Sequence, residues 1–132
     1  MKISATINNR LNENEIVVKT NEVSKEISIA PKQNGLGSSI NGGELLLLAL
    51  ATCFCNDIYR EAGKRNIQVS GVEVEATADF GGEGEAGSNF KYRVKLTSDA
   101  SKDQIISLIR DTDKVAEIHN TLRKGTTVSL VG

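Results

Sequence analysis

The residue in this sequence with the clearest capacity for chemistry is Cys53, one of two cysteines in the chain. A thiol becomes a nucleophile when it loses its proton, and a nearby cation or hydrogen-bond donors must then stabilise the anion. Arg10 or Arg60 could supply that cation. A free cysteine among leucines is also a frequent core residue, so a structural role is the competing interpretation.

The second thiol, Cys55, lies two positions further along. In a helix this spacing directs the two Cβ atoms to nearly opposite faces, so we expect no disulfide between Cys53 and Cys55 within one intact helix. Cys55 could react with an oxidised Cys53 only across subunits or after local unwinding, and we expect it to fill space. Two free thiols are typical of a reducing compartment, which predicts a cytoplasmic location.

Polar residues follow Cys53 along the same predicted helix: Asn56, Asp57, Arg60 and Glu61. Cys53, Asp57 and Arg60 share one stripe because they are four and three residues apart. Glu61 falls near the apolar face, so its carboxylate should be partly buried and paired with a cation such as Arg60. The group indicates either a ligand site or a solvated network of ion pairs.

The only histidine is His119. With Asp113 and Glu117, and with Cys53 or Asp57, it would form a mixed ligand set for a divalent metal. The spacing matches no known ligand motif. The sequence therefore predicts neither a metal nor a cofactor, and we expect His119 to be a hydrogen-bonded structural residue.

The strands and helices expected around these residues predict a protein of the α+β class. Alternation of apolar and polar residues predicts antiparallel strands separated by turns. They are expected at residues 2–7, 15–19, 26–30, 67–80, 90–96 and 126–130. The glycine-rich segment between the fourth and fifth of these has no following helix and no Gly-Lys-Ser/Thr sequence, so it is a flexible hairpin loop and not a phosphate loop.

One long helix is predicted between about residues 42 and 64, where Asn41 and Glu44 have the spacing of a capping box. Its first two turns are apolar nearly all round, which is typical of a helix buried on several sides. In so short a chain this indicates a helix at the centre of the molecule or against a second subunit. Two more helices are predicted, one capped by Ser101 and one at about residues 113–123.

The composition is that of an ordinary soluble domain, with 39% apolar and 25% charged residues. The formal net charge of -1 offers no strong electrostatic attraction to nucleic acid or to an anionic membrane. The longest apolar run, residues 45–51, is too short to span a bilayer, and the first residues do not look like a secretory signal. We therefore expect one domain over residues 1–132, with neither nucleic acid nor a membrane as partner.

Three segments together match one known pattern. Residues 41–53, NGGELLLLALATC, resemble a central helix that leads to a reactive cysteine. Residues 67–74, IQVSGVEV, resemble the strand after that helix, and residues 118–122, IHNTL, resemble the end of a second cysteine motif, Cys-Pro-Val-Ser-Asn-Thr-Leu. The pattern is that of the OsmC/Ohr family (osmotically inducible protein C and organic hydroperoxide resistance), of which the chain resembles a divergent member.

The resemblance implies a fold and an activity. The fold would have antiparallel sheets around a long central helix, in an intertwined homodimer. In peroxidatic members a thiolate reduces organic hydroperoxides, and an external thiol reductant restores the enzyme. Here Cys53 would be the nucleophile, with Glu44 and Arg10 as the other catalytic residues.

The chain departs from the family at two positions. Counting from the matched motifs, Ala116 replaces the second cysteine, and the family's glutamate falls on Gly43, with Glu44 displaced by one residue. The first hypothesis is nonetheless a thiol-dependent peroxidase of oxidative stress defence.

The second hypothesis is a non-peroxidatic relative that binds a small ligand or a metal at its dimer interface. Its site would use the polar residues near the cysteines, namely Cys55, Asn56, Asp57, Arg60, Glu61 and His119. A guanidinium within roughly 4 Å of the Cys53 sulfur would favour the first hypothesis.

Overall fold

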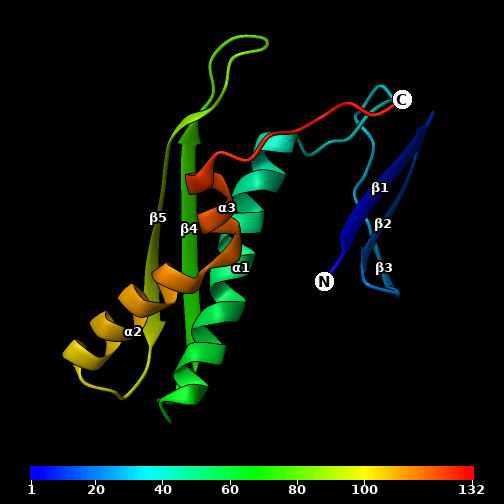
Figure 1. Cartoon of the computed structure of the whole chain (residues 1–132). Coiled ribbons are helices and arrows are strands. Elements are labelled where there is room, and N and C mark those ends of the chain that lie inside the picture. The colour runs from blue at the N-terminus through cyan, green and yellow to red at the C-terminus, as the bar shows by residue number, and fades with distance from the viewer. The chain divides into compact units, whose positions relative to one another are not determined.

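Strands come first in the chain, then a long helix, a second hairpin and two shorter helices. The elements are β1 (Ile3–Arg10), β2 (Glu13–Thr20), β3 (Val23–Ile27), α1 (Gly42–Lys64), β4 (Gly71–Asp79), β5 (Ser88–Thr97), α2 (Lys102–Val115) and α3 (Glu117–Lys124). This computed structural model describes all residues, 1–132, and divides them into two units, residues 1–45 and 46–132 (Figure 1). The α+β class with antiparallel sheets and one long helix is confirmed.

The first unit contains a three-stranded antiparallel sheet in the order β1-β2-β3. Its two hairpins turn at Asn12 and Asn21, whose φ angles of 61° and 52° lie in the left-handed region that asparagine tolerates. The first turn therefore follows Arg10, so β1 continues beyond the expected strand end at residue 7. In the sheet, Ile7 lies opposite Ile16, which lies opposite Ile27 on the other side.

The second unit contains the hydrophobic core. Phe54, Ile58 and Ala62 of α1 are buried together with Leu108 of α2 and Ala116. Half-buried residues of β4 and β5 pack against this group, and Figure 1 shows α1 running lengthwise beside that hairpin. The spacing of the α1 residues, four apart, is the one predicted for its apolar face.

Several predicted bounds differ from the structure, among them three in the second half of the chain. Residues 126–130 form no strand, because no strand of the chain pairs with them. The strand expected from residue 67 begins at Gly71, since the Ile67 N–H instead bonds the Ala62 carbonyl and closes the end of α1. The last helix begins at Glu117 and not near 113, because α2 continues to Val115 and an extended Ala116 (φ −73°, ψ 109°) separates the two.

By length and composition alone, α1 is apolar enough to cross a membrane. It is also the core helix of the second unit, and its second half carries Asp57, Arg60 and Glu61. A core helix of a globular protein passes the same test, so this feature is weak evidence for a membrane span.

Candidate functional site

The Cys53 thiol lies between α1 and the start of α3. Its Sγ is 3.6 Å from Asp57 Oδ2, one turn later in α1, and 3.8 Å from Glu117 Oε2 in α3. The thiol thus has two carboxylates as hydrogen-bond acceptors, one from each helix.

Arg60 forms ion pairs with both of these carboxylates. Its Nη1 lies 3.1 Å from Asp57 Oδ1 and 3.5 Å from Glu117 Oε1. Its Nε lies 3.0 Å from Glu61, which also pairs with Lys64 at 2.9 Å. The guanidinium therefore pairs with acids, and the hydrogen-bond partners of the Cys53 sulfur are carboxylate oxygens.

Two features bring Cys53, Asp57, Arg60 and Glu117 together: the residue spacing within α1, and the interruption between α2 and α3. Cys53, Asp57 and Arg60 follow one another at four and three residues, so they share one stripe of α1. The extended, fully buried Ala116 redirects the chain, so that Glu117 occupies the first turn of α3. An acidic residue in that turn is favoured by the helix dipole.

The charges around Cys53 hold it in its protonated form. Burial, and then the neighbouring Asp57 and Glu117 carboxylates, raise the pKa of the Cys53 thiol, while the Ile118 N–H opposes them. Burial, and then Glu117, also raise the pKa of Asp57. The backbone N–H of Glu117, the hydrogen bond from Asp57 and the charge of Arg60 lower the pKa of Glu117. Glu117 is therefore the carboxylate that stays ionised beside the thiol.

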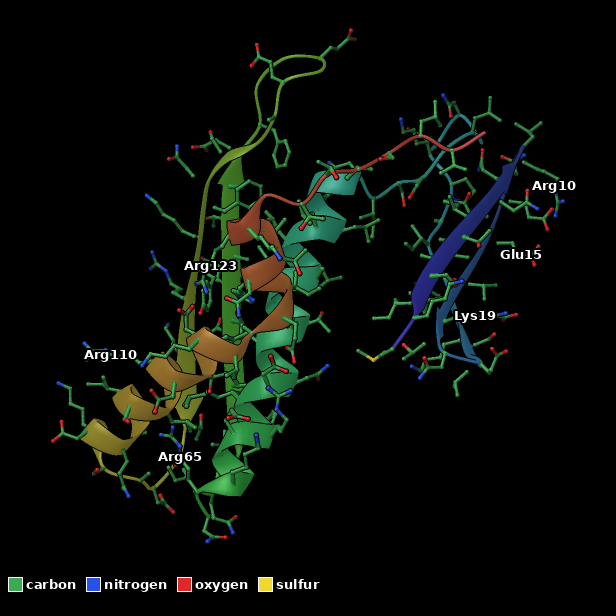
Figure 2. All side chains as sticks on the ribbon, in the orientation of Figure 1. Arg10, Glu15, Lys19, Arg65, Arg110 and Arg123 are labelled. Atoms are coloured by element: carbon green, nitrogen blue, oxygen red, sulfur yellow. The ribbon has the colours of Figure 1, made fainter.

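Arg10 and Glu44, the other residues implied for catalysis, belong to the first unit and have partners there. Arg10 ends β1 (Figure 2). It pairs with Glu13 at 3.1 Å. Glu44 completes the predicted capping box of α1: its carboxylate accepts the Asn41 N–H at 3.0 Å, and its own N–H donates to Asn41 Oδ1 at 2.8 Å.

The predicted ligand residues separate into two groups. Asp57, Arg60 and Glu61 join Cys53 in one network, and the expected pairing of Glu61 with Arg60 is confirmed. Cys55 and Asn56 line a different hollow, together with Leu48 and Val74. Cys55 is a free thiol.

His119 lies away from this network. Its ring packs against Tyr92, with centroids 4.6 Å apart, and against Phe54, with centroids 6.0 Å apart. The side chain is buried, and neither ring nitrogen has a hydrogen-bond partner. The expectation of a hydrogen-bonded histidine is therefore wrong, because the groups that enclose the ring are aromatic.

Of the residues at the site, Glu117 was the hardest to place beside Cys53 from the sequence. It was grouped with Asp113 and His119 as a metal ligand, but Asp113 instead accepts hydrogen bonds from Tyr92 and from Arg123, the latter at 2.7 Å. The available signal was its place directly after Ala116, the position that the resemblance assigns to a second cysteine. Cys53, Asp57 and Glu117 offer ligand atoms within 4.8 Å of one another, which a divalent cation could bridge.

Comparison with known proteins identifies the family of this chain. The signature of the family described as OsmC-like protein matches residues 35–131. The chain belongs to the OsmC-like protein family. None of the proteins with a curated description matches it.

Solved structures show the same fold at low sequence identity. An OsmC-like protein of Mycoplasma pneumoniae is 19% identical, with a TM-score of 0.61 over 92% of this chain and 86% of that one. An organic hydroperoxide resistance protein OsmC of Legionella pneumophila is 17% identical, with a TM-score of 0.61 over 93% and 90%. One from Elizabethkingia anophelis is 20% identical, with a TM-score of 0.56 over 95% and 90%. The recognised family and fold class are thereby confirmed.

Proposed function

We propose that this OsmC-like protein reduces organic hydroperoxides, with Cys53 as the nucleophile and an external thiol as the reductant. The observation that carries the proposal is the Cys53 sulfur on the central helix of an OsmC-like chain, within hydrogen-bonding distance of the Glu117 carboxylate. The hydroperoxide resistance proteins among the structural relatives support the same activity. Two free cysteines fit a cytoplasmic, reducing setting.

The first step requires removal of the thiol proton, because the raised pKa of Cys53 leaves little thiolate at neutral pH. Glu117, 3.8 Å from the sulfur and kept ionised by Arg60, accepts this proton. The sulfur attacks the terminal oxygen of the hydroperoxide, the O–O bond breaks, and the proton passes to the departing alkoxide. The products are the Cys53 sulfenic acid and an alcohol.

The second step requires thiols from solution. By the family resemblance Ala116 stands where a second cysteine would lie, and Cys55 lines a separate hollow. A small thiol therefore attacks the sulfenic acid, releases water and forms a mixed disulfide. A second thiol, or the other end of a dithiol, then releases Cys53 and leaves as an oxidised disulfide.

Turnover of cumene hydroperoxide with excess dithiothreitol tests this proposal. Wild-type protein should consume the hydroperoxide, Cys53→Ser should not, and Cys55→Ser should keep most of the activity. Cys55→Ser is the matched control because it removes the neighbouring thiol of the same helix. A wild-type rate equal to that of Cys53→Ser would refute the peroxidase proposal.

A second candidate function is binding of a divalent cation by Cys53, Asp57 and Glu117. It is favoured by the three ligand atoms lying within 4.8 Å of one another. Titration calorimetry of the reduced protein with Zn²⁺ distinguishes the candidates. Stoichiometric binding that Cys53→Ser and Glu117→Gln both abolish, in a protein without peroxidase turnover, would favour the cation site.

A further inference from the structure

A cavity of about 410 Å³ lies beside His119, on parts of α1, β5 and α3 that the Cys53 network does not use. This volume is within the range of small-molecule sites, roughly 300–1,000 Å³. Leu50, Phe90 and Leu122 form apolar walls, and the His119 ring forms another part of the wall. Phe90 and Leu122 are both exposed, although each is a large apolar side chain.

His119 is a buried polar side chain without a partner. It is only 4% exposed, and neither Nδ1 nor Nε2 takes part in a hydrogen bond. A buried polar group left unpaired costs about 1–3 kcal/mol. The ring lines the cavity although both nitrogens are closed off from solvent, so its resonances can report on a molecule that occupies the cavity.

The charged residues at this cavity are all basic. Lys91 and Arg123 line it, and no acidic side chain does. Arg123 already pairs with Asp113. Lys91 forms no ion pair, whereas Arg93 and Lys95 on the same strand pair with Glu75 and Glu73 at 3.8 and 3.9 Å.

We propose that this cavity binds a small monocarboxylate with an apolar tail. The apolar walls formed by Leu50, Phe90 and Leu122 accommodate the tail, and the carboxylate meets the ammonium group of Lys91. The His119 ring lies in the wall of the same cavity, so its resonances respond to the bound molecule. This site is distinct from the Cys53 network, and its occupation requires no thiol chemistry.

The single histidine gives a direct measurement of binding. The full chain is labelled with ¹⁵N-histidine, and the ring resonances are followed by NMR during titration with hexanoate at constant pH. Hexanol and hexylammonium carry the same tail with no charge and with the opposite charge. Hexanoate should shift the His119 ring signals and reach saturation, hexanol should bind more weakly, and hexylammonium should cause no shift.

Variants test the two parts of the site. Lys91→Gln should weaken hexanoate binding about two- to fivefold, as expected for loss of one partly exposed charge pair. Lys95→Gln removes the same charge from the same strand and should leave affinity unchanged. Leu122→Glu places an acid at an exposed position of the wall and should abolish binding.

Three results would overturn the proposal. The first is no saturable shift of the His119 ring at millimolar hexanoate. The second is an equal response to hexanoate and hexanol, which would make the site merely apolar. The third is an equal loss of affinity in Lys91→Gln and Lys95→Gln, which would indicate nonspecific attraction. Cys53→Ser should bind hexanoate like the wild type, so this test is independent of the peroxidase activity.

Discussion

At the scale of single residues, Cys53 is a thiol surrounded by groups that oppose its ionisation. Its acidic neighbours raise the thiol pKa, and Arg60 is occupied by those same acids. A raised pKa lowers the thiolate fraction but also makes the thiolate, once formed, intrinsically more nucleophilic. Reaction at Cys53 therefore depends on a base that removes the proton as the sulfur attacks.

The Glu117 carboxylate would have two effects: it raises the pKa of the Cys53 thiol, and it accepts the thiol proton. The variant Glu117→Gln separates them. Removing a negative charge should lower the pKa of Cys53, measured by the ultraviolet absorbance of the thiolate in a Cys55→Ser background. If Glu117 is the base, the peroxidase rate at neutral pH should nevertheless fall by about 10²-fold. Glu61→Gln removes the same charge from the Arg60 network without a bond to the sulfur, and its rate should stay close to wild type. A faster Glu117→Gln enzyme would show that the carboxylate only inhibits.

His119 makes stability depend on pH. Burial, and then the charge of Arg123, lower its pKa below 6.5, while Asp113 acts in the opposite direction and the Tyr92 and Phe54 rings add no charge. The unfolded chain therefore binds a proton before the folded protein does. Its neutral ring contributes stability above the unfolded pKa, which is lost as pH falls through 6.5 toward the lower folded value.

Chemical denaturation across this range measures the effect. The free energy of unfolding should fall below pH 6.5 in the wild type and fall less in His119→Phe. Equal pH profiles for the two proteins would show that His119 is not the titrating group.

At the scale of elements, the sequence predicted α1 closely and the C-terminal helices less well. The apolar spacing and the Asn41–Glu44 box place both ends of α1 at the observed residues. The break at Ala116 was not predicted, because alanine favours a helix and carries no local stop signal. Tertiary packing determines where α2 ends, because Ala116 is fully buried in the core.

The same reasoning explains which contacts at the candidate site could be predicted from the sequence. Contacts within α1, such as Cys53 with Asp57 and Arg60 with Glu61, follow from helical periodicity. The contact of Cys53 with Glu117 joins residues 64 positions apart, so it depends on how α3 packs. The enclosure of His119 by Tyr92 likewise depends on β5.

The cap of α2 is a local feature that can be tested. Ser101 accepts the Gln104 N–H at 3.2 Å, and the Gln104 side chain accepts the Ser101 N–H at 3.0 Å. Ser101→Ala should lower the free energy of unfolding by about 0.5–2 kcal/mol, because it leaves an N–H of the first turn unpaired. Ser107→Ala, at an exposed position of the same helix, should be neutral or slightly stabilising. Equal losses in the two variants would contradict the role of the cap.

At the scale of the whole molecule, the buried apolar core belongs to the second unit. The sheet of the first unit carries apolar residues on one face, and Ile3, Ile7 and Val23 are 64%, 56% and 62% exposed. The segment at 126–130 has the alternation of a strand but no partner strand in its own chain. We propose that a second copy of the chain supplies these missing contacts in a homodimer, the assembly that the family resemblance implies.

Light scattering on wild-type protein and two variants tests the dimer. Ile7→Glu places a charge on the apolar face of β1, whereas Thr6→Glu places it on the opposite face. The wild type and Thr6→Glu should be dimers, and Ile7→Glu should dissociate or aggregate. A stable, folded wild-type monomer at micromolar concentration would contradict the proposed assembly.

The central claim is that Cys53 attacks an organic hydroperoxide. The most direct measurement treats reduced protein with one equivalent of cumene hydroperoxide, without added thiol, and traps sulfenic acid with dimedone before peptide mass spectrometry. Because the only other cysteine, Cys55, lines a separate hollow, the sulfenic acid should survive long enough to be trapped on Cys53, with Cys55 unlabelled. An unmodified Cys53 with the hydroperoxide unconsumed, or equal labelling of both cysteines, would contradict the claim.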